Sequence, residues 1–359
     1  MNPDAVRAGK RVPHGGETDR DVLDFSANTT PSVPDGVDAV YEDALEAARR
    51  YPDDEYPEFR AAAGEFVGCD PDRVIPTPGG LAAIRLAMEI TLESGDEALV
   101  PVPSFGEYAR EVELQGASPR FVSHDEILTA DDDDLESCAL AVVCTPNNPT
   151  GEAADPDELA AFADRCADAD TTLLVDEAFL GFTDLPSATR LEAANVIVAR
   201  SLTKLFGLPG LRAGFAVATG DRRDALETAR RAWSLGTPAA RVGAYCLRQD
   251  AFVRETRDRV ARERERLRDR LDERFDVAPS DAPYLLCDVG DRSVDDVVAT
   301  ARADGVAIRD ATTFRGLDSH IRVAVKDRVA NDRLLAALGV SENDGSDAET
   351  DGHGTATRE

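Results

Sequence analysis

The chain of 359 residues is 42% hydrophobic, enough to build the core of one large α/β domain or of a large domain with a smaller one. Its formal net charge of −30 would repel nucleic acids and anionic membranes, so we expect neither as a partner. No apolar run approaches the ~20 residues that span a bilayer, and the N-terminus MNPDAVRAGKRV lacks a signal peptide's apolar segment, which predicts a cytoplasmic protein.

Lysine is rare in this sequence. Among forty lysines and arginines, only Lys10, Lys204 and Lys326 are lysine. Abundant acidic residues with so little lysine suggest a halophilic protein, whose high-salt cytoplasm screens the self-repulsion. An ordinary acidic protein of a mesophile is the alternative. The six cysteines show no metal-binding spacing, so we expect small buried hydrophobic residues and no metal site.

In chain order, the first candidate for ligand binding is PTPGGLAAIRLAM at 76–88. Its glycines stand at an expected helix start, where free backbone N–H groups and the helix dipole favour a phosphate. By itself PGG is equally an ordinary loop. Neither GxGxxG nor GxxxxGK[ST] occurs where a strand feeds a helix, which argues against a nucleotide-binding α/β protein.

Short apolar runs that end in turn residues follow, and they alternate with helical patterns. The runs are LAVVC at 140–144, TLLVD at 172–176 and VIVAR at 196–200, with the helical PDELAAFADRCADA at 156–169 between the first two. This order predicts an α/β fold in which a mainly parallel sheet is sandwiched by helices. In such sheets ligands bind beyond the carboxyl ends of the strands, where the polar motifs TPNNPTG and SLTK fall.

Further along, the arginine-rich stretch 254–274 has acids interleaved at helical spacing, which predicts a solvated helix rather than a nucleic-acid contact. It leads to PYLLCDV, SVDDVVATARADG and HIRVAVKD, the elements of a smaller α+β domain. Residues beyond 340 have almost no apolar content. We therefore expect an N-terminal arm at 1–35, a large domain at 36–245, a small C-terminal domain at 246–340 and a disordered acidic tail at 341–359.

Lys204 is the strongest candidate for catalysis. A lysine can lose its proton and condense with a carbonyl, whereas an arginine stays charged. After a buried strand, Lys204 could therefore be the Schiff-base lysine of a pyridoxal 5′-phosphate enzyme. Taken alone this is weak evidence, because a phosphate-binding or surface lysine is commoner. Ser201, Thr203 and Arg212 could hold a phosphate beside it.

The whole stretch RSLTKLFGLPGLRAGF at 200–215 resembles the signature of fold-type I, class I and II pyridoxal-phosphate enzymes, the aspartate-aminotransferase superfamily. The resemblance implies the pyridoxal-phosphate-dependent transferase fold, with pyridoxal 5′-phosphate attached at Lys204. It also implies that Ser201, Thr203 and Arg212 contact the cofactor phosphate.

Other pieces of that family occur in the expected order. Asp176 ends TLLVD, where a carboxylate can keep the pyridine nitrogen protonated and make the ring an electron sink. The resemblance implies that Asn148 of TPNNPTG contacts the phenolic oxygen of the cofactor, although NNP alone would be a turn. It further implies that the Gly80 and Leu81 amides contact the phosphate and that Phe105 stacks on the ring; a core phenylalanine is the alternative for Phe105.

The resemblance also implies residues for the substrate and for a second subunit. Arg322 matches the arginine that binds the substrate carboxylate, or another anionic group, through two parallel hydrogen bonds. A second arginine at Arg309 suggests a doubly anionic substrate, such as a phosphorylated amino acid or amino alcohol. Tyr51 matches a tyrosine that reaches into the neighbouring subunit's site and contacts the cofactor, which implies a homodimer with shared active sites. His14 and Asn28 would face the substrate.

Two activities within the family compete. Histidinol-phosphate aminotransferases carry a tyrosine three residues after the aspartate, whereas this chain has Phe179, as in L-threonine-O-3-phosphate decarboxylases of cobalamin biosynthesis. The N-terminal segments HGG at 14–16 and LDFSANTTP at 23–31 also resemble the N-terminal part of the decarboxylase. We therefore expect a lyase that converts threonine phosphate to (R)-1-aminopropan-2-ol O-phosphate, with an aminotransferase as the alternative. The hypothesis that this protein is a non-enzymatic binding protein that has kept an enzyme fold predicts that Lys204 or Asp176 has been lost. Both residues are present.

Overall fold

The computed structural model describes residues 1–340, so the tail expected to be disordered, 341–359, lies outside the described residues. The largest sheet has seven strands in the order β2-β8-β7-β6-β5-β3-β4. They are β2 (Val74–Thr77), β3 (Glu97–Val102), β4 (Ser118–Ser123), β5 (Leu140–Cys144), β6 (Thr172–Asp176), β7 (Val196–Ser201) and β8 (Gly214–Val217). All neighbours run parallel except β8, which is antiparallel to β2 and β7. The predicted α/β fold with a mainly parallel sheet is confirmed.

Helices cover both faces of this sheet, which explains why its central strands are continuous apolar runs. Every residue of β5 and β6 is buried. Along β6, Leu173 and Val175 belong to the apolar cluster that includes residues of α7 (Pro156–Asp168). Leu174 points to the opposite face and packs in the cluster that includes residues of α4 (Gly80–Thr91). The carboxyl ends of the strands therefore remain as the open edge of the layer.

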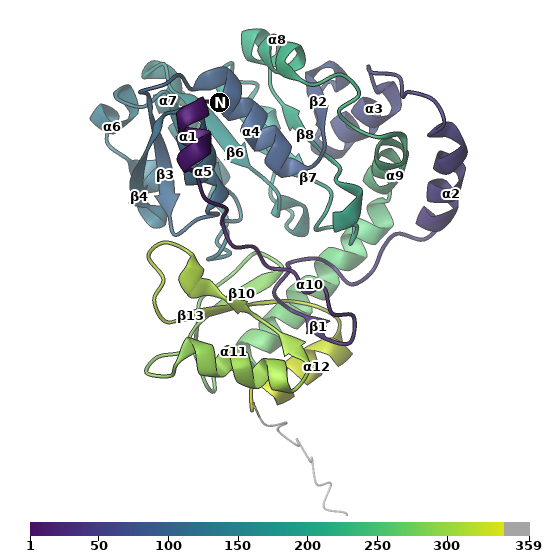
Figure 1. The fold of residues 1–359 in the computed structure, drawn as a ribbon, viewed down its shortest axis with the longest axis vertical. Helices are drawn as coiled ribbons and strands as arrows, with labels where there is room; N and C mark the ends of the chain where they lie inside the picture. The colour runs from purple at the N-terminus through teal and green to yellow at the C-terminus, as the bar shows by residue number, and fades with distance from the viewer. Residues whose placement is uncertain (341–359) are drawn as a thin grey trace, which may run out of the picture.

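A second, antiparallel sheet lies below the first in Figure 1, with strands in the order β12-β13-β10-β9. These are β9 (Asp276–Val277), β10 (Tyr284–Asp288), β12 (Arg309–Asp310) and β13 (His320–Ala324), accompanied by α11 (Val294–Ala303) and α12 (Arg328–Ala337). The helix α10 (Asp250–Leu271) runs between the two parts. The domain boundaries expected at residues 35, 245 and 340 stay predictions.

The helix predicted for 254–274 is present as α10, but one of its sides is buried and not solvated. Val253, Val260 and Leu267 recur every seven residues and are buried along one side of the helix. Arg259 and Arg264 donate to backbone carbonyls of the C-terminal part at 3.0 and 3.2 Å. The prediction was wrong for this face, because the apolar stripe is too sparse to stand out among the arginines in the sequence.

The N-terminal segment joins the two parts of the molecule. It descends from α1 (Pro3–Ala8) across the large sheet to β1 (Leu23–Asp24) in the lower part. There β1 pairs in parallel with β11 (Val306–Ala307). Phe25 continues this pairing, donating to the Ala307 carbonyl at 2.7 Å and accepting from the Ala324 amide at 2.9 Å. The segment is thereby held across the open edge of the seven-stranded sheet.

The remaining elements complete the helical layers. The α-helices are α2 (Val37–Ala47), α3 (Pro57–Val67), α5 (Glu107–Gln115), α6 (Asp132–Glu136), α8 (Gly220–Ala229) and α9 (Thr237–Leu247), and the 3₁₀ turns are Pro71–Arg73, His124–Thr129, Leu180–Phe182, Ala188–Leu191, Pro209–Leu211 and Ala311–Thr313. Within residues 1–340, none of the helices has the length and apolar character that crossing a membrane requires. The same residues contain no group of His, Cys, Asp and Glu side chains arranged to hold a metal ion.

Candidate active site

A cavity of about 350 Å³ lies where the carboxyl ends of β5, β6 and β7 meet the N-terminal segment and the small sheet. Parallel strands end at one edge, so motifs that are distant in sequence converge there. All the predicted site residues except Tyr51 line this cavity: His14, Asn28, Gly80, Leu81, Phe105, Asn148, Asp176, Ser201, Thr203, Lys204, Arg212, Arg309 and Arg322.

Lys204 lies in the turn that follows β7. Its backbone carbonyl accepts a hydrogen bond from the Thr30 amide at 3.1 Å, so the N-terminal segment lies directly over the turn. Burial, followed by the positive charges of Arg322 and Arg212, lowers the pKa of the Lys204 amine from 10.5 to about 8. The amine therefore loses its proton far more readily than an exposed lysine does.

We expect the amine of Lys204 in cofactor-free protein to react with an acylating or arylating reagent at a rate that rises with pH and levels off above about 8. The same shift makes the free energy of unfolding depend on pH. Because the protonated amine destabilises the folded state, the free energy of unfolding should rise as the pH increases from about 8 toward 10.5. Peptide mapping after labelling at several pH values measures the profile at each lysine. A Lys204 rate still climbing at pH 10 would contradict the assignment.

A cradle for a phosphate lies beside the lysine. The Oγ of Ser201 and the Oγ1 of Thr203 are 2.8 Å apart, and α4 begins opposite them with its first backbone N–H groups free of intrahelical partners. Arg212 adopts the left-handed conformation, with φ +55°. Gly79 has φ +98°, a conformation that favours glycine, and a Cβ there would lie 2.8 Å from an Arg212 guanidinium nitrogen and displace it.

Asp176 ends β6 with both carboxylate oxygens engaged. Oδ2 accepts a hydrogen bond from the Tyr108 hydroxyl at 2.6 Å, and Oδ1 accepts from the Ala178 amide at 2.9 Å. Burial raises the pKa of Asp176, while the hydrogen bond from Tyr108 acts in the opposite direction. These two donors hold the carboxylate in one orientation at the floor of the cavity, where it could pair with a protonated ring nitrogen.

Asn148 and Arg322 lie next to each other on the other side of the cavity. Arg322 donates through Nη1 to the Asn148 side-chain oxygen and through Nη2 to the Ser26 carbonyl at 3.1 Å. Because its oxygen is occupied, the Asn148 amide nitrogen is the group left to donate to a ligand. Burial lowers the pKa of Arg322 to about 10, with the nearby charge of Arg309 adding to the effect. The guanidinium still carries its charge at neutral pH.

Arg309 and His14 bring charge from the small sheet and the N-terminal segment. Arg309 donates through Nη2 to the Pro13 carbonyl at 2.8 Å and to the Thr313 hydroxyl at 2.9 Å. His14 places Nε2 2.9 Å from a carboxylate oxygen of Glu107, a buried residue at the start of α5. The N-terminal segment is thus held at the mouth of the cavity from two sides.

The aromatic residues of the cavity separate into two positions. Phe105 lies between His14 and Tyr108, with ring centroids 5.8 and 5.6 Å away. Phe179 packs edge-on against Tyr284 at 5.0 Å and presents no hydroxyl to the cavity. A hydrogen-bond donor is therefore missing at the place where the resemblance puts a tyrosine in many aminotransferases.

Tyr51 lies outside the cavity in its own chain. Its side chain is 79% exposed, and its ring stacks on Trp233 with centroids 4.5 Å apart. The predicted contact of Tyr51 with a cofactor is therefore not made in the cavity of its own chain.

The cavity fits pyridoxal 5′-phosphate. The Ser201–Thr203–Arg212 cradle matches its phosphate in charge and donors, and the lysine of lowered pKa matches its aldehyde. Within the described chain, the buried Nε of Arg322 and Oδ1 of Asn28 have no hydrogen-bond partner, as expected of groups that meet a polar ligand.

Residues 20–338 match the family model described as aminotransferase class I and II. The chain belongs to this family. Pyridoxal 5′-phosphate is the cofactor of the family, and one solved structure with this fold, a histidinol-phosphate aminotransferase of Sinorhizobium meliloti, is of a complex with it. That structure has a TM-score of 0.78 at 21% identity and covers 94% of this chain and 94% of its own, so its likeness bears on the fold.

Curated relatives in the family divide between two activities. Histidinol-phosphate aminotransferase 2 of Archaeoglobus fulgidus is 32% identical, over 89% of this chain and 93% of its own length. Threonine-phosphate decarboxylase of Salmonella typhimurium is 33% identical, over 88% of this chain and 90% of its own. Histidinol-phosphate aminotransferases are the more numerous among the similar proteins. Identity of this size establishes an enzyme of the family without separating a lyase from an aminotransferase.

Tyr108 and Glu107 are site residues that sequence reasoning missed. Both belong to the motif PVPSFGEY, in which Tyr108 lies in the first turn of α5, three residues after Phe105. That spacing was the available signal. The partner of Tyr108, however, is 68 residues away and the partner of Glu107 is 93 residues away. No local pattern connects residues at such separations.

We expect Tyr108→Phe to lower turnover about tenfold, since a hydrogen bond to a charged group contributes about 1.5–3 kcal/mol. Losing this donor raises the pKa of Asp176, so the acidic limb of the pH–rate profile should move to higher pH. Steady-state rates from pH 5 to 9 measure both effects. An unmoved acidic limb would show that the hydroxyl does not influence Asp176.

Proposed function

We propose that this enzyme decarboxylates L-threonine O-3-phosphate to (R)-1-aminopropan-2-ol O-phosphate, a step of cobalamin biosynthesis. The observation that carries the choice within the family is Phe179, which lines the cavity where histidinol-phosphate aminotransferases, by resemblance, present a tyrosine hydroxyl. His14 and Asn28, from the HGG and LDFSANTTP segments, support it because both face the same cavity.

Two arginines support a doubly anionic substrate. Arg309 and Arg322 pair across β12 and β13, and each has a buried Nε without a hydrogen-bond partner in the described chain. A carboxylate and a phosphate supply the matching acceptors, and a guanidinium binds each of them in a planar, two-pronged arrangement. A substrate with one anionic group would leave one of these buried donors unpaired, at a cost in binding.

The residues of the chain have separate roles in this reaction. When bound, pyridoxal 5′-phosphate accepts the electron pair released as the bond between Cα and the carboxylate breaks and CO₂ leaves. Asp176 keeps the ring nitrogen protonated, and Asn148 donates to the phenolic oxygen. The Lys204 amine would hold the proton that is returned to Cα. Ser201, Thr203 and Arg212 hold the phosphate of the cofactor throughout.

The bond that breaks at Cα depends on how the substrate is oriented in the cavity. Arg309 and Arg322 determine this orientation by dividing the carboxylate and the phosphate between them. In the proposed reaction they would hold the carboxylate in the position from which CO₂ is lost. In transamination the Cα–H bond would take that place, and Lys204 would remove the proton instead.

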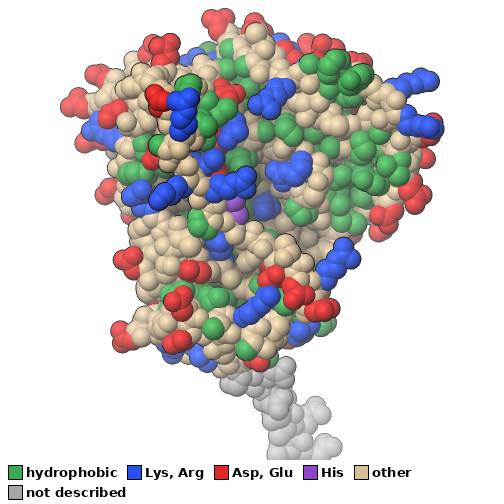
Figure 2. Space-filling view, viewed as in Figure 1, with side chains coloured by type: hydrophobic (Ala, Val, Ile, Leu, Met, Phe, Trp, Pro, Cys, Tyr) green, Lys and Arg blue, Asp and Glu red, His purple; other side chains and the backbone are tan. Residues whose placement is uncertain are grey.

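We further propose a homodimer in which Tyr51 serves the neighbouring site. Exposed apolar side chains lie on and next to α2 and at Trp233, which stacks on Tyr51: Val33, Tyr41, Leu45, Tyr51 and Trp233. Figure 2 shows hydrophobic side chains gathered over the part of the molecule where α2 and α9 lie. A patch of this kind on an otherwise acidic protein is typical of a protein interface. A cytoplasm of high salt is the setting we propose, on the basis of the net charge of −30 and the scarcity of lysine.

We expect purified protein, supplied with pyridoxal 5′-phosphate in high salt, to release CO₂ from threonine phosphate without a keto-acid acceptor. Product analysis by mass spectrometry should find one amino alcohol phosphate for each CO₂. Glutamate with imidazole-acetol phosphate is the matched assay for the aminotransferase, which the Archaeoglobus fulgidus relative favours. Transfer in that assay without CO₂ release in the first would make the alternative the correct function.

A further inference from the structure

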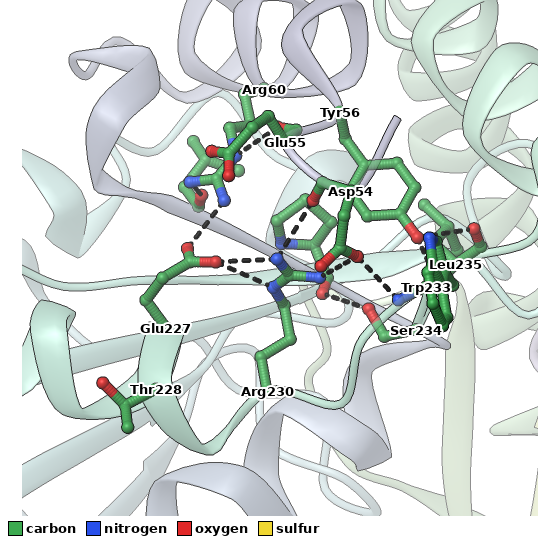
Figure 3. Close-up of polar contacts among 12 residues, drawn as sticks. Asp54, Glu55, Tyr56, Arg60, Glu227, Thr228, Arg230, Trp233, Ser234 and Leu235 are labelled. Atoms are coloured by element: carbon green, nitrogen blue, oxygen red, sulfur yellow. Dashed lines mark hydrogen bonds and ion pairs between the residues drawn. The ribbon is translucent and has the colours of Figure 1, made fainter. Parts of the chain in front are cut away.

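An ionic network joins the loop before α3 to the segment after α8 (Figure 3). Arg230 donates to the Asp54 carboxylate at 2.9 Å and to Glu227 at 2.7 Å, and Arg60 donates to the other oxygen of Glu227 at 2.6 Å. The side chains of Arg230 and Arg60 are only 3% and 6% exposed. The two guanidinium groups are buried while their acidic partners are partly exposed, and the charge-assisted hydrogen bonds between them tie the two segments together.

The network ends on Trp233. The Asp54 carboxylate accepts from the Trp233 amide at 2.6 Å, and Trp233 has φ +52°, a left-handed conformation that is costly for a bulky residue. The next turn is also fixed, since the Leu235 amide donates to the Tyr56 hydroxyl at 3.1 Å and that hydroxyl donates to the Leu235 carbonyl at 2.9 Å. The backbone strain at Trp233 is therefore maintained by bonds on both sides, as Figure 3 shows.

The indole held in this way packs on Tyr51. The two rings stack at 4.5 Å with an angle of 28° between their planes, and Trp233 is itself 49% exposed. Within the described chain the Tyr51 hydroxyl has no hydrogen-bond partner, so the stack with Trp233 is the contact that orients its ring. A rigid support beneath an exposed tyrosine would predetermine the direction in which the hydroxyl points.

We propose that Trp233 is a positioning residue for Tyr51 in the neighbouring subunit's active site. The Asp54–Arg230 pair fixes the indole, the indole fixes the phenol ring, and the hydroxyl enters the second site already directed at the cofactor phosphate. The inference rests on the proposed homodimer. Preorganisation of this kind strengthens binding by removing the cost of ordering a side chain on association.

The test compares variants of the dimeric holoenzyme by the dissociation constant for pyridoxal 5′-phosphate. Trp233→Ala should raise this constant about threefold to tenfold, the range expected for loss of one aromatic pair. Trp233→Phe, which keeps a stacking ring, should restore it to within about twofold. In Tyr51→Phe, which removes the hydroxyl being positioned, the further change Trp233→Ala should have little additional effect.

The chain offers an internal probe, because Trp233 is its single tryptophan. Its fluorescence should fall when pyridoxal 5′-phosphate binds, since the cofactor of the neighbouring site would lie close to the indole. Asp54→Asn should alter the emission maximum of Trp233 by loosening its backbone bond. Phe121→Ala removes an exposed aromatic residue of β4, outside the proposed interface patch, and is the control, which should leave the coupling between Trp233 and Tyr51 unchanged.

The outcomes distinguish failure of the proposed homodimer from failure of the positioning role of Trp233. A holoenzyme that light scattering finds monomeric, with full activity, would overturn the shared-site homodimer and this inference with it. A dimeric, active holoenzyme in which Trp233→Ala leaves cofactor affinity unchanged would overturn the role of Trp233 alone. Additive effects of the Trp233 and Tyr51 substitutions would do the same. Weaker dimers with unchanged affinity per dimer would make Trp233 a structural interface residue only.

Discussion

Replacement of Lys204 by alanine is expected to abolish the visible, borohydride-sensitive absorbance of protein supplied with pyridoxal 5′-phosphate and to reduce turnover about 10³-fold or more. The amine is the group of lowered pKa in the cavity that can bond covalently to the aldehyde of the cofactor. Lys204→Arg should fail in the same way, because it keeps a positive charge but cannot lose its proton near neutral pH. Absorbance spectra before and after borohydride, with rates in parallel, measure both effects.

Lys326→Ala is the matched control for this prediction. Burial lowers the pKa of the Lys326 amine as well, but that amine lies over the Phe25 ring and near the Thr29 carbonyl, and it does not line the cavity. The control should retain the absorbance and most of the activity. If Lys204→Ala kept the absorbance while Lys326→Ala lost it, the covalent role would belong to the other lysine.

We expect Asp176→Asn to reduce turnover about 10²- to 10³-fold, since the neutral amide no longer stabilises positive charge on the ring nitrogen. The substitution keeps the shape of the side chain, and Tyr108 can still donate to its oxygen. Lys204 remains, so the borohydride-sensitive absorbance should survive. This retained absorbance with lost turnover distinguishes Asp176 from Lys204, and parallel spectra and rates measure it.

Glu177→Gln provides the control, since the adjacent carboxylate is buried and pairs with Arg200 at 2.8 Å without lining the cavity. Breaking this pair should lower the melting temperature, because Arg200 is left buried without its counter-charge. Turnover for each folded molecule should change little. Full activity in Asp176→Asn, at unchanged stability, would rule out the role we assign to that carboxylate.

Several parts of the fold could be predicted because short stretches of the sequence determine them. The runs at 140–144 and 172–176 are apolar throughout, as strands buried on both faces must be, and they are β5 and β6. The polar residues just after such strands converge at one edge of a parallel sheet, and Asn148, Asp176 and Lys204 accordingly line one cavity. The roles of these residues remain proposals until the substitutions are measured.

Other features could not be predicted because they join segments without any shared local pattern. The hydrogen bond between Tyr108 and Asp176, the contact of His14 with Glu107 and the pairing of β1 with β11 all link distant residues. The buried side of α10 was missed because its apolar residues are diluted by arginine. In each case the partner is chosen by packing in three dimensions.

The sequence by itself determined the chemistry that this protein can perform. A lysine after a buried strand in a chain that has only three lysines, an aspartate at a strand end and a glycine-rich helix start are local features, and they suffice to indicate the family and its cofactor. The tertiary structure alone decided how those groups are oriented and charged. Burial and neighbouring guanidinium groups lower the pKa of Lys204, and a tyrosine from α5 orients Asp176. The outward position of Tyr51, supported by Trp233, likewise depends on contacts between segments far apart in the chain, since electrostatics and packing act through space.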